Sequence, residues 1–341
     1  MDATSPRRVV GIKGLPLVST SVLLGLVVFG CAETRDLGST VPHGLLPVDD
    51  RNPILIANDG AFDNWQGEYA ILLSSSGGPK LVGIAVNTSG PWPDIETNIA
   101  GWRGLVTAAR DSGLRDIPDP VTSIGAPLVR PTDGRISSTM PNRSEGAHLI
   151  VEKSSEVSLP YRPLVVATGG RLTDVADAYL MDPTVAERVV VVSSMGSVTT
   201  SGGAMGVPNG EMDPWADAIV SKVFRFIQVS SFYDQLTEVP DSAVPALPAN
   251  PFGDWIAAKH SKVWTTQLAA DQVSVLAVGV PSFVAAVETV SVASVVGAGA
   301  TTGPDLATNP SGSARLVTQV ASSGAISRFW QALTDPATFG P

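Results

Sequence analysis

The sequence predicts an α/β protein with an open, mostly parallel but mixed sheet and helices on both faces. Apolar, β-branched runs alternate with segments of helical spacing along most of the chain. Residues 189–193 are so apolar that both faces of this strand must be buried, as in a parallel sheet. The 341 residues are 44 % hydrophobic and 16 % charged, a composition that supports a large core and excludes a disordered chain.

The expected elements follow this alternation from residue 53 onward. We expect strands at residues 53–57, 80–86, 120–124, 164–167, 189–193 and 227–230, with a β-like segment at 284–296. We expect helices at residues 69–74, 95–112, 173–180, 213–226 and 272–279. Residues 240–253 contain four prolines, which predicts a long loop that could serve as a lid. In such sheets ligands bind beyond the carboxyl ends of the strands, so the residues after each strand are the functional candidates.

The charge balance excludes several classes of function. Lys and Arg number 22 against 32 Asp and Glu, a net charge of −10, and no stretch is rich in Lys or Arg. We therefore expect no nucleic-acid partner. The single cysteine excludes a disulfide scaffold and a cysteine-based zinc site, and the three histidines never form a spaced pair.

The N-terminal segment has the pattern of a secretion signal. Arg7, Arg8 and Lys13 precede an interrupted apolar stretch at residues 15–29, and the only cysteine, Cys31, follows Gly30. This arrangement resembles a bacterial lipobox, which implies lipidation of Cys31 and a protein anchored to a membrane of the cell envelope. An ordinary secretory signal and a buried cysteine are the alternatives.

These features divide the chain into three parts. We expect a lipoprotein-type signal peptide at residues 1–30, a tether at 31–50, and one α/β domain at 51–341.

A dense set of polar side chains follows the first expected strand. Asp59 and Asp63, with the amides Asn58 and Asn64, lie within seven residues at the carboxyl end of that strand. Oxygen ligands at this density suit Ca²⁺ or Mg²⁺. The alternative is an Asx-rich turn that caps the next helix.

This segment resembles the DxDxGxDD signature of the inosine-uridine preferring nucleoside hydrolase family. Further segments resemble family motifs in the same order: residues 163–174 (PLVVATGGRLTD) the ATGPLTN motif, 182–188 with 191–196 the VLMGG strand and the helix end before it, 211–217 (EMDPWAD) the EFNxxxD motif, and Ala270-Asp271 the His-Asp pair. The resemblance covers residues 52–335 and agrees with the predicted fold class.

The resemblance implies hydrolysis of the N-glycosidic bond of ribonucleosides with a calcium-held water. It implies that Asp59 is the general base and a metal ligand. It assigns the other calcium ligands to Asn64, the carbonyl of Thr168, and Asp271. It assigns substrate contacts to Asp63, Met195, Glu211, Asp213 and Trp215. The implied partner is a small nucleoside.

Several positions depart from the family pattern. Ala57 replaces the first aspartate of the signature, Asn64 replaces the last, and Asp213 replaces the ribose asparagine. Ala270 replaces the histidine that could protonate the leaving base. Loss of a carboxylate weakens a calcium site, although Asp213 could restore the charge. A catalytically inactive nucleoside- or sugar-binding lipoprotein is therefore the alternative. The sequence leaves open the base preference and whether the protein forms a homo-oligomer.

Overall fold

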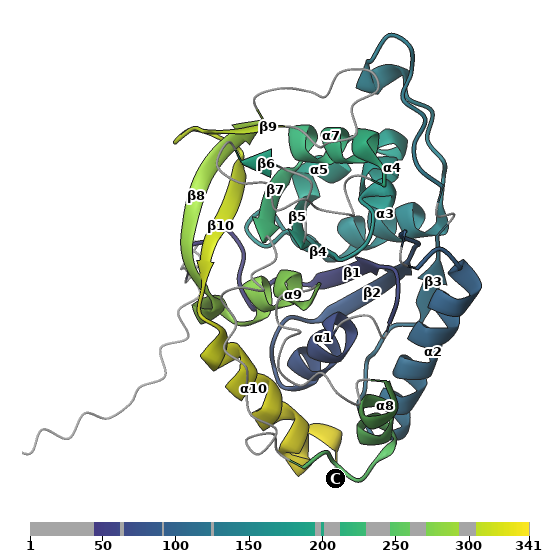
Figure 1. Cartoon of the computed structure of the whole chain (residues 1–341), viewed down its shortest axis with the longest axis vertical. Helices are drawn as coiled ribbons and strands as arrows, with labels where there is room; N and C mark the ends of the chain where they lie inside the picture. Colours follow the sequence, from purple (N-terminus) through teal and green to yellow (C-terminus); the bar gives the residue numbers. More distant parts are fainter. Residues whose placement is uncertain are drawn as a thin grey trace, which may run out of the picture. The chain divides into compact units, whose positions relative to one another are not determined.

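A ten-stranded mixed sheet organises the domain (Figure 1). The computed structural model describes residues 44–61, 65–90, 92–123, 126–194, 199–200, 212–229, 246–259, 271–292 and 305–340, which belong to one unit, Thr40–Pro341. The strands are β1 Ile54–Asn58, β2 Leu81–Val86, β3 Pro120–Thr122, β4 Leu164–Thr168, β5 Val189–Ser194, β6 Thr199–Thr200, β7 Arg225–Val229, β8 Val284–Val292, β9 Asp305–Thr308 and β10 Ala314–Val320.

The sheet has the order β3-β2-β1-β4-β5-β7-β10-β8-β9-β6. From β3 to β10 every neighbouring pair is parallel, and β8 is antiparallel to both β10 and β9. The chain adds β2 and β3 on one side of β1, and then β4, β5 and β7 on the other. The carboxyl ends of β1 and β4 therefore meet at a switch point, where α/β sheets bind their ligands. Residue Ala57 lies opposite Thr168, and Thr168 lies opposite Ser193, so these strand ends are level.

Two apolar cores cover the two faces of the sheet because successive side chains of a strand point to opposite sides. One core contains residues of α1 Gln66–Ser75, α2 Ile95–Asp111, α8 Pro251–Lys259, α9 Gln272–Gly279 and α10 Ser322–Thr334. The other contains residues of α3 Glu145–Val157, α4 Thr173–Met181, α5 Val185–Arg188 and α7 Pro214–Val223. Short 3-10 helices lie at η1 Ile136–Ser138, η5 Pro281–Phe283 and η6 Pro336–Phe339. The predicted fold class is thus confirmed, and β5 is buried along its whole length.

Some predicted boundaries are wrong. The helix predicted at 213–226 ends at Val223, and the next residues form β7, because the apolar run continues through both elements. The proline-rich loop predicted at 240–253 gives way to α8 at Pro251, where proline suits the first position of a helix. Helices α3 and α10 have no counterpart among the predicted elements. Leu46 and Val48, predicted within the tether, are buried in the first core.

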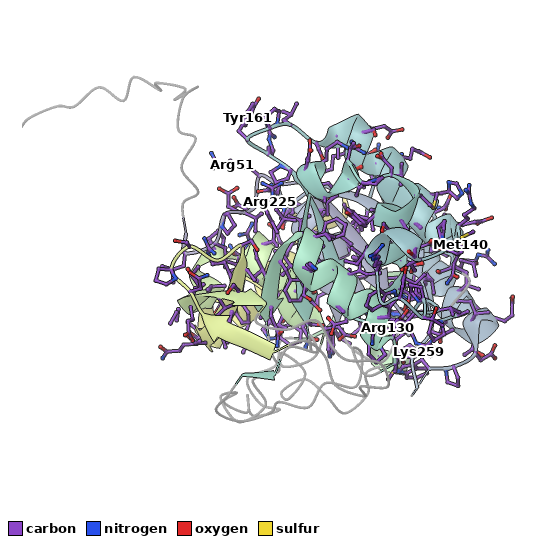
Figure 2. All side chains as sticks on the ribbon, turned by 90° about the horizontal axis from the view of Figure 1, so that it is seen from above. Arg51, Arg130, Met140, Tyr161, Arg225 and Lys259 are labelled. Atoms are coloured by element: carbon purple, nitrogen blue, oxygen red, sulfur yellow. The ribbon has the colours of Figure 1, made fainter. Side chains whose placement is uncertain are left out.

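The labelled side chains of Figure 2 lie on two sides of the domain. Arg51, Tyr161 and Arg225 precede or begin strands, and Figure 2 shows them on the side of the domain away from Arg130 and Lys259.

Among the described residues, no helix has the length and apolar character needed to cross a bilayer.

Candidate active site

Asp59 directly follows β1 at the switch point and is 3 % exposed. Its backbone N–H donates to Asn58 Oδ1 at 2.7 Å, and its Oδ1 accepts the N–H of Gly60 at 2.7 Å. The indole Nε1 of Trp102 donates to its carbonyl oxygen at 2.7 Å. These three bonds fix the backbone and one carboxylate oxygen of the predicted general base.

The turn Gly169-Gly170, which follows β4, makes room for polar side chains beside Asp59. A Cβ atom on Gly169 would lie 2.5 Å from Asp271 Cγ. A Cβ on Gly170 would lie 2.3 Å from Asn87 Oδ1 and 3.3 Å from the backbone nitrogen of Asp59. Any side chain at these positions would displace those groups, so the glycines are required for close approach rather than for a positive φ.

Two predicted calcium ligands, Thr168 and Asp271, both lie close to the hydroxyl of Ser194. The hydroxyl Oγ of Ser194, the last residue of β5, lies 3.0 Å from the carbonyl oxygen of Thr168. The same Oγ lies 2.9 Å from Asp271 Oδ1. Asp271 is 4 % exposed and immediately precedes α9. The topology therefore brings Asp59, Thr168 and Asp271 to one edge of the sheet, although Asp271 lies more than 200 residues after Asp59.

The oxygen set is not a cluster of acids. Within the described ranges, no group of three or more His, Cys, Asp or Glu side chains could hold a metal ion. A cation here would meet carboxylate and carbonyl oxygens, which are ligands that Ca²⁺ takes in proteins.

A buried hydrogen-bond relay, which the sequence did not indicate, connects the Asp59 and Asp271 segments. Asn58 Nδ2 donates to Gln66 Oε1 at 2.7 Å. Gln66 Nε2 donates to Ser274 Oγ at 2.7 Å and to the carbonyl oxygen of Asp271 at 3.3 Å. Asn58, Gln66 and Ser274 are all 0 % exposed. The relay thus ties β1, α1 and α9 together beneath the site.

Asn87 follows β2 and faces the same turn. Its Nδ2 donates to Asp174 Oδ2 and to the carbonyl oxygen of Arg171, both at 3.3 Å. The carboxylate of Asp174 also accepts the hydroxyls of Ser123 and Ser144. Burial raises the pKa of Asp174, and these hydrogen bonds oppose the shift. Asp174 thereby orients Asn87.

Asp213, a predicted substrate contact, is the N-cap of α7. Its Oδ1 accepts the N–H of Ala216 at 3.0 Å. Its Oδ2 accepts the N–H of Leu128 at 2.9 Å and the hydroxyl of Thr173 at 2.7 Å. Burial raises the pKa of Asp213, and its bonds and the nearby Arg171 oppose that rise. Since both oxygens of this 1 % exposed carboxylate are engaged, capping accounts for Asp213 without a sugar, and the ribose contact stays a prediction.

Arg171 is a further residue that sequence reasoning missed. Burial lowers the pKa of Arg171, while the charges of Asp213 and Asp59 oppose that shift. Its guanidinium is therefore a positive charge near the predicted general base. Its position directly after Gly169-Gly170 at a strand end was the available signal.

Trp215, predicted to line the substrate pocket, is 4 % exposed and belongs to the second core. Its Nε1 donates to Thr139 Oγ1 at 3.0 Å, and the Arg130 guanidinium carbon lies 5.0 Å from its ring centroid. Its substrate contact stays a prediction. The remaining predicted residues lie outside the described part of the chain: Cys31, Asp63, Asn64, Met195 and Glu211.

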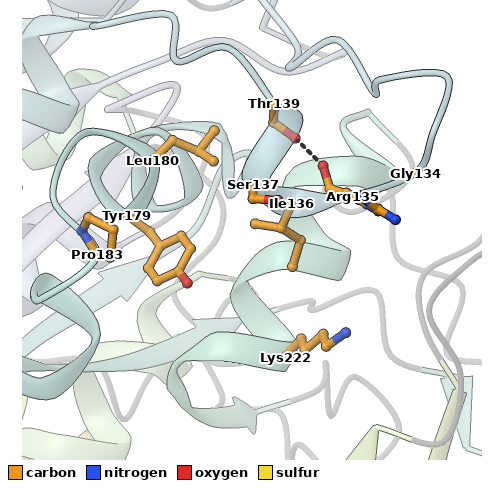
Figure 3. Close-up of a pocket in the computed structure, with 9 residues that line it drawn as sticks. All are labelled: Gly134, Arg135, Ile136, Ser137, Thr139, Tyr179, Leu180, Pro183 and Lys222. Atoms are coloured by element: carbon orange, nitrogen blue, oxygen red, sulfur yellow. Dashed lines mark hydrogen bonds between the residues drawn. The ribbon is translucent and has the colours of Figure 1, made fainter.

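A hollow of about 650 Å³ lies elsewhere, between η1, the C-terminal part of α4 and the last turn of α7 (Figure 3). Arg135, Tyr179 and Lys222 contribute to its lining. Tyr179 and Lys222 stand near the ends of helices that begin at the carboxyl edge of the sheet, so this hollow is not the strand-end site.

Comparison with known proteins bears on the fold. No family model and no curated protein matches the chain. Among solved structures, a plant nucleoside hydrolase is 15 % identical with a TM-score of 0.58, covering 83 % of this chain and 100 % of that one. An inosine-guanosine nucleoside hydrolase is 16 % identical with a TM-score of 0.59, covering 82 % and 98 %. A type III effector protein complexed with adenosine diphosphate ribose is 11 % identical with a TM-score of 0.56, covering 86 % and 96 %. The chain therefore has a nucleoside hydrolase-like fold.

Proposed function

We propose that this protein hydrolyses the N-glycosidic bond of ribonucleosides or related N-ribosides. The observation that carries the proposal is the meeting of the Thr168 carbonyl and the Asp271 carboxylate at the Ser194 hydroxyl, at the strand edge that also bears Asp59. The fold is that of proteins named nucleoside hydrolases, and the edge is where such sheets bind ligands.

Calcium is the cofactor that we propose for this site. Asp59, Asp271 and the Thr168 carbonyl offer hard oxygen ligands, and Asn64 would add an amide oxygen. When bound, the ion would supply Lewis-acid help by orienting a water and lowering its pKa. The two carboxylates give this set fewer charges than a site with three, so we expect moderate rather than tight affinity.

The protein side chains have distinct proposed roles in the reaction. Asp59 takes a proton from the attacking water, whose oxygen forms a bond to the anomeric carbon as the carbon–nitrogen bond breaks. The electron pair of the broken bond stays with the leaving base, which also takes up a proton. Asp59 and Asp271 stabilise the positive charge that develops on the sugar. The predicted contacts Asp63, Met195 and Glu211 would line the glycone side.

The proposal is tested with wild type and two variants on a panel of purine and pyrimidine nucleosides. Asp59→Asn keeps the side-chain shape and removes the base, so released reducing sugar should fall by about 10²–10⁴-fold. Asp119→Asn is the matched control, because this carboxylate is 83 % exposed and precedes β3 at the opposite edge. Elemental analysis of the purified protein should find calcium. Hydrolysis that survives Asp59→Asn unchanged contradicts the mechanism.

A binding protein without turnover is the second candidate. The similarly folded effector protein complexed with adenosine diphosphate ribose favours it, as do Asn64 and Ala270 in this sequence. Nucleoside or adenosine diphosphate ribose binding measured by calorimetry, with no sugar released by any variant, would select this candidate. For either function we propose a lipid-anchored protein of the cell envelope, as the segment before Cys31 indicates.

A further inference from the structure

We propose that the hydroxyl of Ser194 is an oxygen ligand of the cation site, in addition to the ligands that the resemblance assigns. This inference rests on the proposed function only in that it concerns the same cation. It adds a residue that the sequence did not single out, at the end of the strand β5.

The hydroxyl of Ser194 lies within hydrogen-bond distance of two acceptors at once. Two acceptors, the Thr168 carbonyl and Asp271 Oδ1, lie 3.0 and 2.9 Å from it. A serine hydroxyl carries a single proton and satisfies only one of them. Whichever acceptor the proton faces, the other contact places two oxygens about 3 Å apart with no proton directed between them. This happens where Ser194 is 0 % exposed.

A cation placed among the three oxygens would remove this conflict, because each would direct a lone pair at the ion. Oxygens about 3 Å apart can each lie about 2.3–2.6 Å from one Ca²⁺, whose coordination number is about 6–8. Hydroxyl, carbonyl and carboxylate are hard ligands that suit this ion. The spacing observed at Ser194 therefore fits neighbouring positions in one coordination sphere.

An additional neutral ligand would strengthen calcium binding, because the site lacks a carboxylate of the family signature. Asn64 stands where the family signature has an aspartate. Asp213, which could have restored that charge, uses both carboxylate oxygens to cap α7 and to bind Leu128 and Thr173. Ser194 supplies an oxygen without a charge, which raises the coordination number of a site whose proposed carboxylate ligands are Asp59 and Asp271.

The test is a calcium titration by calorimetry of wild type and four variants. Ser194→Ala removes the oxygen, and Ser194→Cys replaces it with a sulfur that Ca²⁺ avoids while it preserves packing. Both should weaken calcium binding by roughly 10–100-fold, the usual effect of removing a residue that supports a metal site. Ser194→Thr keeps the hydroxyl and should bind within about threefold of wild type.

Ser193→Ala is the matched control. Ser193 is also buried at the end of β5, but its hydroxyl donates to the Ser194 carbonyl at 3.2 Å and not to Asp271. This variant should bind calcium like wild type. A calcium-loaded crystal structure should place Ser194 Oγ about 2.3–2.6 Å from the ion.

Several outcomes decide between the claims. Calcium affinity that is unchanged in folded Ser194→Ala and Ser194→Cys overturns the inference but leaves the proposed function intact. Weakened affinity in these variants, in a protein that cleaves no nucleoside, supports the inference and overturns the hydrolase. A wild type that binds no calcium overturns the inference and the proposed cofactor together. Thermal unfolding without calcium reports whether each variant is folded.

Discussion

Asp217 is a fully buried carboxylate in the first turn of α7. Neither of its oxygens has a hydrogen-bond partner among the described residues. Burial raises the pKa of Asp217 well above its usual value, and the charge of Asp213 adds to the shift. Asp177, in α4, is also 0 % exposed, but it accepts the backbone N–H groups of Arg143 at 3.0 Å and Ser144 at 2.8 Å.

This contrast predicts a pH-dependent effect of Asp217→Asn. Because the folded-state pKa is raised, the folded protein holds the proton more strongly than the unfolded chain does. The stability penalty is absent below the unfolded pKa of about 3.9 and grows as pH rises toward the folded pKa, by up to about 1.4 kcal/mol per pH unit. Asp217→Asn should therefore match wild type near pH 4 and be more stable at pH 7.5, in urea unfolding. Asp177→Asn should destabilise at pH 7.5, and a pH-independent effect of Asp217→Asn would contradict the prediction.

At the scale of elements, two glutamines stand at equivalent places and differ in their partners. Gln66 begins α1 and Gln272 begins α9, and both are 0 % exposed. Gln66 links β1 to α9 through Asn58, Ser274 and the Asp271 carbonyl. The amide of Gln272 has no hydrogen-bond partner among the described residues. An unsatisfied buried amide destabilises a protein, whereas a satisfied one holds its neighbours in place.

The same substitution should therefore have opposite effects at the two positions. Gln66→Met removes three hydrogen bonds and leaves the buried Asn58 Nδ2 without this acceptor, so it should lower the free energy of unfolding by about 1–3 kcal/mol, although Ser274 Oγ and the Asp271 carbonyl still bond to each other. Gln272→Met removes an unsatisfied amide and should raise that free energy by about 1 kcal/mol. Urea unfolding at one pH measures both. Equal losses in the two variants would show that side-chain shape, and not hydrogen bonding, decides stability here.

At the scale of the whole molecule, the sequence was most informative where the pattern is local. Alternating apolar runs indicated the strands, and the end of the first strand led to Asp59, whereas Thr168 and Asp271 came from the resemblance to the nucleoside hydrolase motifs. Asp213 was predicted to contact the substrate, but it is the N-cap of α7. The Asp-Pro pair before an apolar helix is also an N-cap signature. Gln66 and Ser194 could not be recognised, since both contact Asp271, which lies 205 and 77 residues away and which only the folded sheet brings near them.

The location of the molecule in the cell depends on Cys31, which lies outside the described residues. The cysteine directly follows an apolar stretch with a basic flank, as in a lipobox. Lipidation would add acyl chains whose burial contributes about 0.8 kcal/mol per CH₂, so the protein should sediment with membranes. Cys31→Ser should release it to the soluble fraction and abolish labelling with radioactive palmitate. Gly30→Ala keeps a small residue before the cysteine and should remain anchored. A Cys31→Ser protein that still partitions with membranes would show that another part of the chain holds it there.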